Sequence, residues 1–174
     1  MTKETIYEPS EEIINDAVIS NQEFEELYKE SINNPDQFWD QQARTYLSWD
    51  KEWDVIKESD LTKGDVSWFK GAKLNASVNC IDRHLENNGE KTAIIWEGDD
   101  PQDSLKISYK QLHESVCKFA NALKKRGIGK GDRVCIYMPM IPEAAYAILA
   151  CARIGAIHSV VSVSYTHLTL PTKA

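Results

Sequence analysis

The stretch RVCIYMPMIPEAAYAILACARIGAIHSVV, residues 133–161, decides the fold class of this chain. Its two ends, 133–138 and 156–161, are short apolar runs rich in β-branched residues, a pattern typical of buried strands. Between them Pro142 suits the first turn of a helix and Gly155 suits its end. Two apolar strands joined by a helix of about a dozen residues predict a parallel βαβ unit with a right-handed crossover.

Strand and helix patterns also alternate upstream of this unit. We expect strands at 92–97 and 106–108, separated by a turn at 98–101. Ser108 and Gln111 then have the spacing of a capping box, which predicts a helix that ends at Gly127. The apolar stripe of this helix is expected to face the sheet and consists of Leu112, Val116, Phe119, Ala120 and Leu123.

Helical patterns dominate the chain before residue 89. Residues 1–20 are mostly polar and acidic and are expected to form a loose lead-in. Residues 66–69 are expected to be extended. Amphipathic helices are predicted from Glu23, from Pro35 and over 74–85, and Gly89 is the candidate residue that ends the last of them.

Composition and charge exclude several classes of protein. The 174 residues are 42% hydrophobic and 27% charged, as in a globular domain. No apolar run is long enough for a membrane span, and the N-terminus has no secretory signal, so we expect a cytoplasmic protein. Residues 1–60 hold 16 acidic and 5 basic side chains, and the chain has no basic stripe. Neither nucleic acid nor an anionic membrane is therefore an expected partner.

Two groups of residues could suggest chemistry. The run Gly127-Ile128-Gly129-Lys130-Gly131 follows a helix and precedes a strand, the reverse of a dinucleotide fingerprint, so it is interpreted as a helix cap and turn. The cysteines form no CxxC pair, which argues against a zinc knuckle. We expect all four to be buried free thiols in a reducing compartment: Cys80, Cys117, Cys135 and Cys151.

The histidines do not form a recognisable site either. Cys80 and His84 share one helix face, but no third metal ligand is in sight. His113 lies beside the apolar stripe without an obvious acid or nucleophile partner, and His158 is interpreted as a core histidine. We therefore predict no catalytic, no cofactor-binding and no metal-binding residue in this chain.

Five runs, nearly without gaps, together resemble one family, the AMP-forming acetyl-CoA synthetases (acetate–CoA ligases). They are SINNPDQFW at 31–39, NCIDRHL at 79–85, KTAIIWEGD at 91–99, VCIYMPMIPEA at 134–144 and ACARIGAIHSVV at 150–161. The resemblance covers roughly residues 20–161.

The resemblance implies an α/β fold: a helical N-terminal extension, then the first βαβ units of the large N-terminal domain of adenylate-forming (ANL) enzymes, truncated. It implies that the complete enzyme converts ATP, acetate and CoA, with Mg, into acetyl-CoA, AMP and pyrophosphate through acetyl-adenylate. The expected divisions are a lead-in at 1–20, the synthetase N-terminal region at 21–88, the start of the AMP-binding domain at 89–161 and a non-family tail at 162–174.

This chain departs from the family pattern after Val161. At this point the family has an aromatic residue and a Gly-Gly-Phe-Ser turn, whereas residues 162–174 of this chain resemble translated foreign sequence. Thr166 and His167 are therefore not assigned to a site. The leading hypothesis is an N-terminal fragment of an acetate–CoA ligase, inactive alone and binding none of these cofactors. The alternatives are a self-contained small α/β module that binds a nucleotide or a protein, and a fragment of a propionyl-CoA synthetase.

Overall fold

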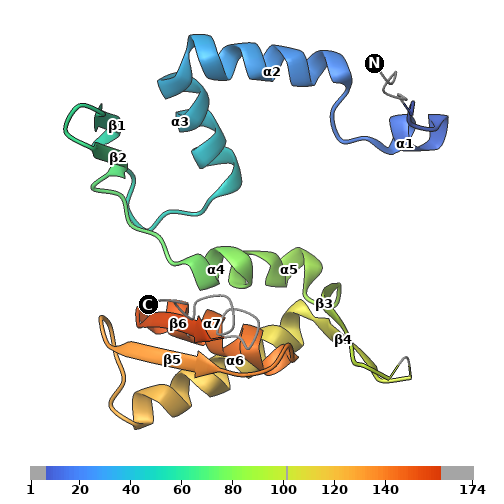
Figure 1. Ribbon diagram of the computed structural model, residues 1–174, viewed down its shortest axis with the longest axis vertical. Coiled ribbons are helices and arrows are strands. Elements are labelled where there is room, and N and C mark those ends of the chain that lie inside the picture. Colours follow the sequence, from blue (N-terminus) through green and yellow to red (C-terminus); the bar gives the residue numbers. More distant parts are fainter. Residues whose placement is uncertain (1–6, 101, 162–174) are drawn as a thin grey trace, which may run out of the picture. The chain divides into compact units, whose positions relative to one another are not determined.

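The computed structural model describes residues 7–100 and 102–161, which form two compact units (Figure 1). The first unit contains the chain up to Leu47 together with Asp54–Lys70. The second contains Ser48–Trp53 and the chain from Gly71 onward. The expected tail at 162–174 and the last residue of the expected turn at 98–101 lie outside the described residues.

The first unit combines helices with one β-hairpin. Ser20 begins α2 with a capping box to Glu23, and Pro35 lies in the first turn of α3, so both predicted helices are confirmed. The elements are α1 (Glu11–Asp16), α2 (Asn21–Asn33), α3 (Pro35–Tyr46) and the antiparallel strands β1 (Val55–Asp60) and β2 (Asp65–Lys70).

Two features of this unit differ from the sequence prediction. The lead-in holds a short helix, α1, which Ser10 caps by accepting a hydrogen bond from the Ile13 amide. All of its residues are exposed, so its sequence has no buried apolar stripe from which the helix could be predicted. Strand β1 was not predicted, because four of its six residues are charged or polar and only its antiparallel pairing with β2 makes it a strand.

The second unit contains the predicted alternation of strands and helices. Its elements are α4 (Ala76–Cys80), the 3-10 turn η1 (Asp82–His84), α5 (Leu85–Asn88), β3 (Thr92–Glu97), β4 (Ser104–Ser108), α6 (Tyr109–Lys125), β5 (Arg133–Tyr137), α7 (Pro142–Ile154) and β6 (Ile157–Val161). Strands β3 and β4 pair antiparallel. Strands β5 and β6 pair parallel in the register Arg133↔Ile157 to Tyr137↔Val161.

The parallel unit that the sequence predicted is therefore confirmed. Pro142 occupies the first turn of α7, where its missing N–H costs nothing. Gly155 ends the helix with φ +74°, a left-handed conformation that favours glycine. The capping box of Ser108 and Gln111 likewise begins α6 as expected.

The core of the second unit lies where α6 meets α7. The buried stripe of α6 consists of Leu112, Val116, Ala120 and Leu123, and it faces Ala147, Ala150 and Cys151 of α7. The small side chains of α7 allow the two helices to pack closely. The expectation that this stripe faces the sheet was only partly right, because α6 contacts α7 more extensively than it contacts β3 and β4. Phe119, on the flank of the stripe, is only half-buried.

The segment 74–85 is not the single helix that its apolar spacing predicted. It breaks at Ile81, whose backbone leaves the helical region at φ −125° and ψ −66° while its side chain is fully buried. Gly89 follows α5 as its C-cap, so the prediction that this glycine ends the helical segment is confirmed.

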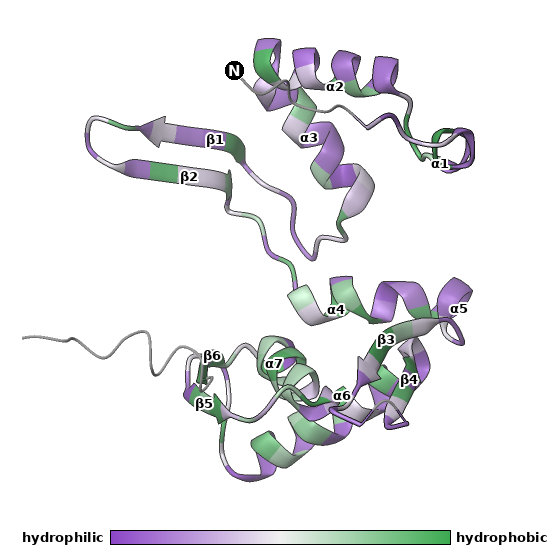
Figure 2. Cartoon of the chain, turned by 45° about the vertical axis from the view of Figure 1, so that its right-hand side comes forward, coloured by the Kyte–Doolittle hydropathy of each residue, from purple (hydrophilic) through white to green (hydrophobic). Residues whose placement is uncertain are grey.

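Apolar side chains are also exposed on the β5–β6 pair. Alternation along β5 buries Ile136 at 3% exposure and leaves Tyr137 72% exposed, and Ile157 and Val160 of β6 are about half exposed. In Figure 2, α2 is largely hydrophilic, whereas α7 is pale to hydrophobic, in line with the different burial of the two helices. No helix in the described ranges is long and apolar enough to cross a membrane.

We predict that Leu112→Ala lowers the free energy of unfolding of the second unit by about 2–5 kcal/mol, because Leu112 is 5% exposed within the core. Leu105→Ala, at a position 47% exposed on β4, is the control and should cost much less. Urea denaturation followed by circular dichroism measures both. Equal losses for the two variants would contradict the assignment of the α6–α7 contact as the core.

Candidate functional site

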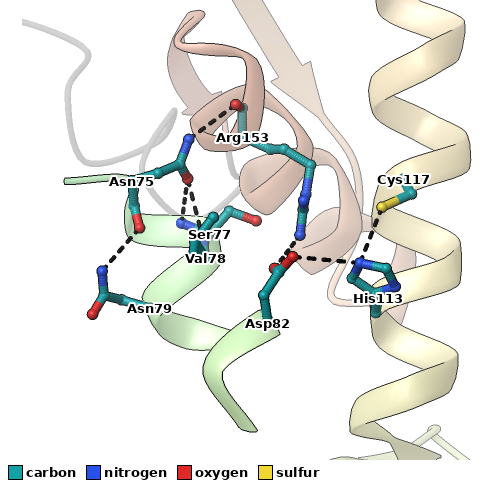
Figure 3. Close-up of polar contacts among 8 residues, drawn as sticks. All are labelled: Asn75, Ser77, Val78, Asn79, Asp82, His113, Cys117 and Arg153. Carbon is teal, nitrogen blue, oxygen red and sulfur yellow. Dashed lines mark hydrogen bonds and ion pairs between the residues drawn. The ribbon is translucent and has the colours of Figure 1, made fainter. Parts of the chain in front are cut away.

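Polar side chains gather where α4, η1, α6 and α7 meet (Figure 3). We call this group the junction cluster and define it as Asn75, Asp82, His113, Cys117 and Arg153. Hydrogen bonds and ion pairs link these residues to one another, so the junction cluster is the candidate functional site of the second unit.

Asn75 joins the start of α4 to the end of α7. Its Oδ1 accepts hydrogen bonds from the amides of Ser77 at 2.9 Å and Val78 at 3.3 Å, as a helix N-cap does. Its Nδ2 donates to the backbone carbonyl of Arg153 at 3.0 Å. Asn79 continues the contact, since its side chain bonds both backbone groups of Ser48. These amide side chains therefore hold backbone segments together.

Asp82 is the centre of charge in the junction cluster. One carboxylate oxygen pairs with Nη2 of Arg153, and the other lies 3.5 Å from Nε2 of His113. The side chains are 28%, 19% and 31% exposed for Asp82, Arg153 and His113, so the group is partly buried. Partial burial strengthens the electrostatic attraction within an ion pair, and it also raises the free-energy cost of leaving one charged member unpaired.

The imidazole of His113 has a second neighbour. Its Nε2 lies 3.5 Å from Sγ of Cys117, one helical turn further along α6. A nucleophile–base–orienter triad uses the two ring nitrogens for different partners, one for the nucleophile and one for the acid. Here a single nitrogen faces both the thiol and the carboxylate, so the junction cluster does not have the geometry of a catalytic triad.

The structure corrects two sequence expectations about these residues. His113, expected to lack an acid or nucleophile partner, has both. The spacing of Cys117, four residues further on the same helix, was a signal in the sequence. No local signal pointed to Asp82, which is distant along the chain and is brought near only by tertiary packing. The prediction that all four cysteines are buried was also wrong: Cys80 and Cys135 are exposed, Cys117 is half-buried and only Cys151 is buried. Burial raises the pKa of the Cys151 thiol.

The glycine run after α6 is a cap and a turn, as predicted. Gly127 and Gly131 have φ values of +83° and +88°. Their amides donate to the carbonyls of Lys124 and Gly155, and the amide of Gly129 donates to Asp132. A phosphate cradle needs free amides that converge on the ligand. Because these three amides already have internal partners, the run does not fit the phosphates of a nucleotide.

The remaining candidates are separate from the junction cluster. Cys80 is exposed, and His84 packs its ring against Tyr109 at 5.3 Å between centroids. His158 is half-buried on β6. Among residues 7–100 and 102–161, no three His, Cys, Asp or Glu side chains are grouped so as to hold a metal ion.

Comparison with known families defines the class of the protein. Residues 81–170 match the family model described as AMP-binding enzyme, so the chain belongs to that family of α/β adenylate-forming proteins. Residues 24–80 match a second model, described as acetyl-coenzyme A synthetase N-terminus. The resemblance to AMP-forming acetyl-CoA synthetases stated from the sequence is confirmed by these two adjoining matches.

Individual relatives agree with the family. The chain is 59% identical over 145 residues to acetyl-coenzyme A synthetase 2 of Pseudomonas aeruginosa, covering 83% of this chain and 22% of that protein. It is 56% identical over 161 residues to acetyl-coenzyme A synthetase of Saccharophagus degradans, covering 92% of this chain and 25% of that protein. The chain therefore spans about a quarter of the length of the curated relatives it matches.

A solved structure supports the fold. The acetoacetyl-CoA synthetase from Streptomyces lividans superimposes with a TM-score of 0.70 over 86% of this chain and 23% of its own, at 23% identity. The predicted fold class, a helical extension followed by the first βαβ units of the adenylate-forming fold, is confirmed.

We predict that Asp82→Asn destabilises the second unit by about 1–3 kcal/mol, because it leaves the sheltered guanidinium of Arg153 without its counter-charge. Glu90→Gln is the control: the Lys110–Glu90 pair is 3.5 Å long and largely exposed, so its loss should change little. Chemical denaturation of the two variants compares them directly. A control as destabilised as Asp82→Asn would contradict a structural role for the junction cluster.

Proposed function

We propose that this chain is the N-terminal part of an AMP-forming acetate–CoA ligase. The complete enzyme would join acetate to CoA in two half-reactions, with acetyl-adenylate as the intermediate and pyrophosphate and AMP as the products. The observation that carries the proposal is the pair of adjoining family matches, which run without interruption from the synthetase N-terminus into the AMP-binding region. We choose acetate over propionate because the relatives described above are acetyl-coenzyme A synthetases.

We also propose that the chain alone is inactive and binds neither Mg-ATP nor CoA. Adenylate formation depends on groups that stabilise charge around the phosphates and position the attacking carboxylate. The glycine run uses its amides internally and the junction cluster holds helices together, so neither supplies such groups. The exposed apolar residues of β5 and β6 support a role for this unit as one part of a larger sheet.

The domain divisions are part of the same proposal. We assign a lead-in to 1–20, the synthetase N-terminal region to 21–88 and the start of the AMP-binding domain to 89–161. We keep 162–174 as a non-family tail, although the match to the AMP-binding model extends to residue 170. Under this assignment the cellular location is the cytoplasm, where ATP, acetate and CoA are available to the complete enzyme.

A chimaera tests the proposal. Residues 24–161 replace the corresponding segment of the Pseudomonas aeruginosa relative, and acetyl-CoA formation from acetate, ATP and CoA is measured. We predict activity within about tenfold of the parent enzyme, because this segment supplies the same packing and none of the reacting groups. A folded chimaera without activity would overturn the proposal.

The 174-residue chain alone is the second arm of the test. Acetate-dependent exchange of pyrophosphate into ATP should stay at the level of a blank without protein. Exchange above the blank would contradict the predicted inactivity. Saturable binding of ATP by the chain without exchange would favour the self-contained nucleotide-binding module instead.

A further inference from the structure

A cleft of about 590 Å³ opens beside Cys117, on the side of α6 that leads to the glycine turn. Lys124, Lys130 and Arg153 contribute to its lining, and none of its described lining residues is acidic. Arg153 is paired with Asp82. Lys124 and Lys130 have no ion-pair partner within the described ranges, so the cleft carries uncompensated positive charge next to a thiol.

The thiol itself has an unusual set of neighbours. Nε2 of His113 lies 3.5 Å from both Sγ of Cys117 and a carboxylate oxygen of Asp82 (Figure 3). A proton on Nε2 therefore faces two acceptors. An N–H at this position can donate to a thiolate at Cys117. Arg153 offsets the charge of Asp82, which would otherwise oppose a thiolate nearby.

The other three cysteines lack this environment. Cys80 and Cys135 are exposed, and within the part of the chain that the structure describes neither thiol has a hydrogen-bond partner. Cys151 is fully buried, and its burial raises the pKa of the thiol. Because the thiolate is the reactive form of cysteine, these three serve as internal standards for Cys117.

We propose that Cys117 is a thiol–disulfide exchange site for anionic disulfides, with glutathione disulfide as the representative of that class. In the exchange, His113 accepts the thiol proton at Nε2 and the Cys117 thiolate attacks one sulfur of the disulfide. One S–S bond forms, between Cys117 and a glutathione sulfur, while the S–S bond of glutathione disulfide breaks. The second glutathione leaves as a thiolate and takes up the proton, so electrons and atoms balance.

The charge of the cleft sets the preference for an anionic partner. Lys124 and Lys130 line the same cleft as Cys117, so their ammonium groups offer partners for the carboxylates of a glutathionyl group on that thiol. Its volume lies within the range of pockets that hold molecules of this size. A neutral alkylating reagent gains nothing from these two cations, which separates the effect of the cleft from that of the thiolate.

The test uses the 174-residue chain, glutathione disulfide and peptide mass mapping of each cysteine over time. Cys117 should be modified about tenfold faster than Cys80 and Cys135, with Cys151 unmodified. His113→Gln keeps an N–H donor but cannot take the proton. This variant should bring the rate at Cys117 down to that of the exposed standards, with both glutathione disulfide and iodoacetamide.

The paired substitution Lys124→Gln with Lys130→Gln tests the cleft. It should slow the reaction of Cys117 with glutathione disulfide about tenfold at low salt and slow the reaction with neutral iodoacetamide much less. Both lysines are exposed, so this variant keeps the core intact even if His113→Gln does not fold. Modification of Cys117 no faster than Cys80 and Cys135, or equal slowing of both reagents by the lysine variant, would overturn the proposal.

Discussion

The close approach of neighbouring helices to α7 is the constraint on which the second unit depends. The buried face of α7 consists of Ala147, Ala150 and Cys151, whose small side chains leave room for the larger Leu112, Val116 and Leu123 of α6. Helix α4 packs against α7 as well, and Asn75 fixes that contact through the Arg153 carbonyl. Because interiors are packed to high density, one larger residue on this face of α7 would displace its neighbours.

The same helix connects the core to the polar contacts. Arg153 lies in the last turn of α7, where its side chain reaches Asp82 and its carbonyl accepts from Asn75. His113 and Cys117 of α6 are brought to this point by the α6–α7 contact. The junction cluster therefore owes its geometry to helix packing, and a change in the spacing of the helices would separate the imidazole of His113 from the carboxylate of Asp82.

Features with local causes could be predicted from the sequence, and features with distant causes could not. Pro142, Gly155 and the Ser108–Gln111 box act within a few residues, and the helix ends they predicted are those observed. The apolar neighbours of Cys135 suggested a buried thiol, but the alternation of β5 places this side chain and Ile136 on opposite faces. The pairing of Asp82 with His113 and Arg153 forms only through tertiary packing, so it could not be predicted from the spacing of these residues in the sequence.

The family assignment and the share of its relatives that the chain spans point to the same interpretation. The chain matches about a quarter of the length of acetyl-coenzyme A synthetases, and its polar groups serve packing and turns. The most direct test of this account is the sequence of the genomic DNA beyond the codon for Val161. We predict an in-frame continuation into Gly-Gly-Phe-Ser and the remainder of an AMP-binding domain. Genomic DNA that instead encodes residues 162–174 followed by a stop codon would contradict it.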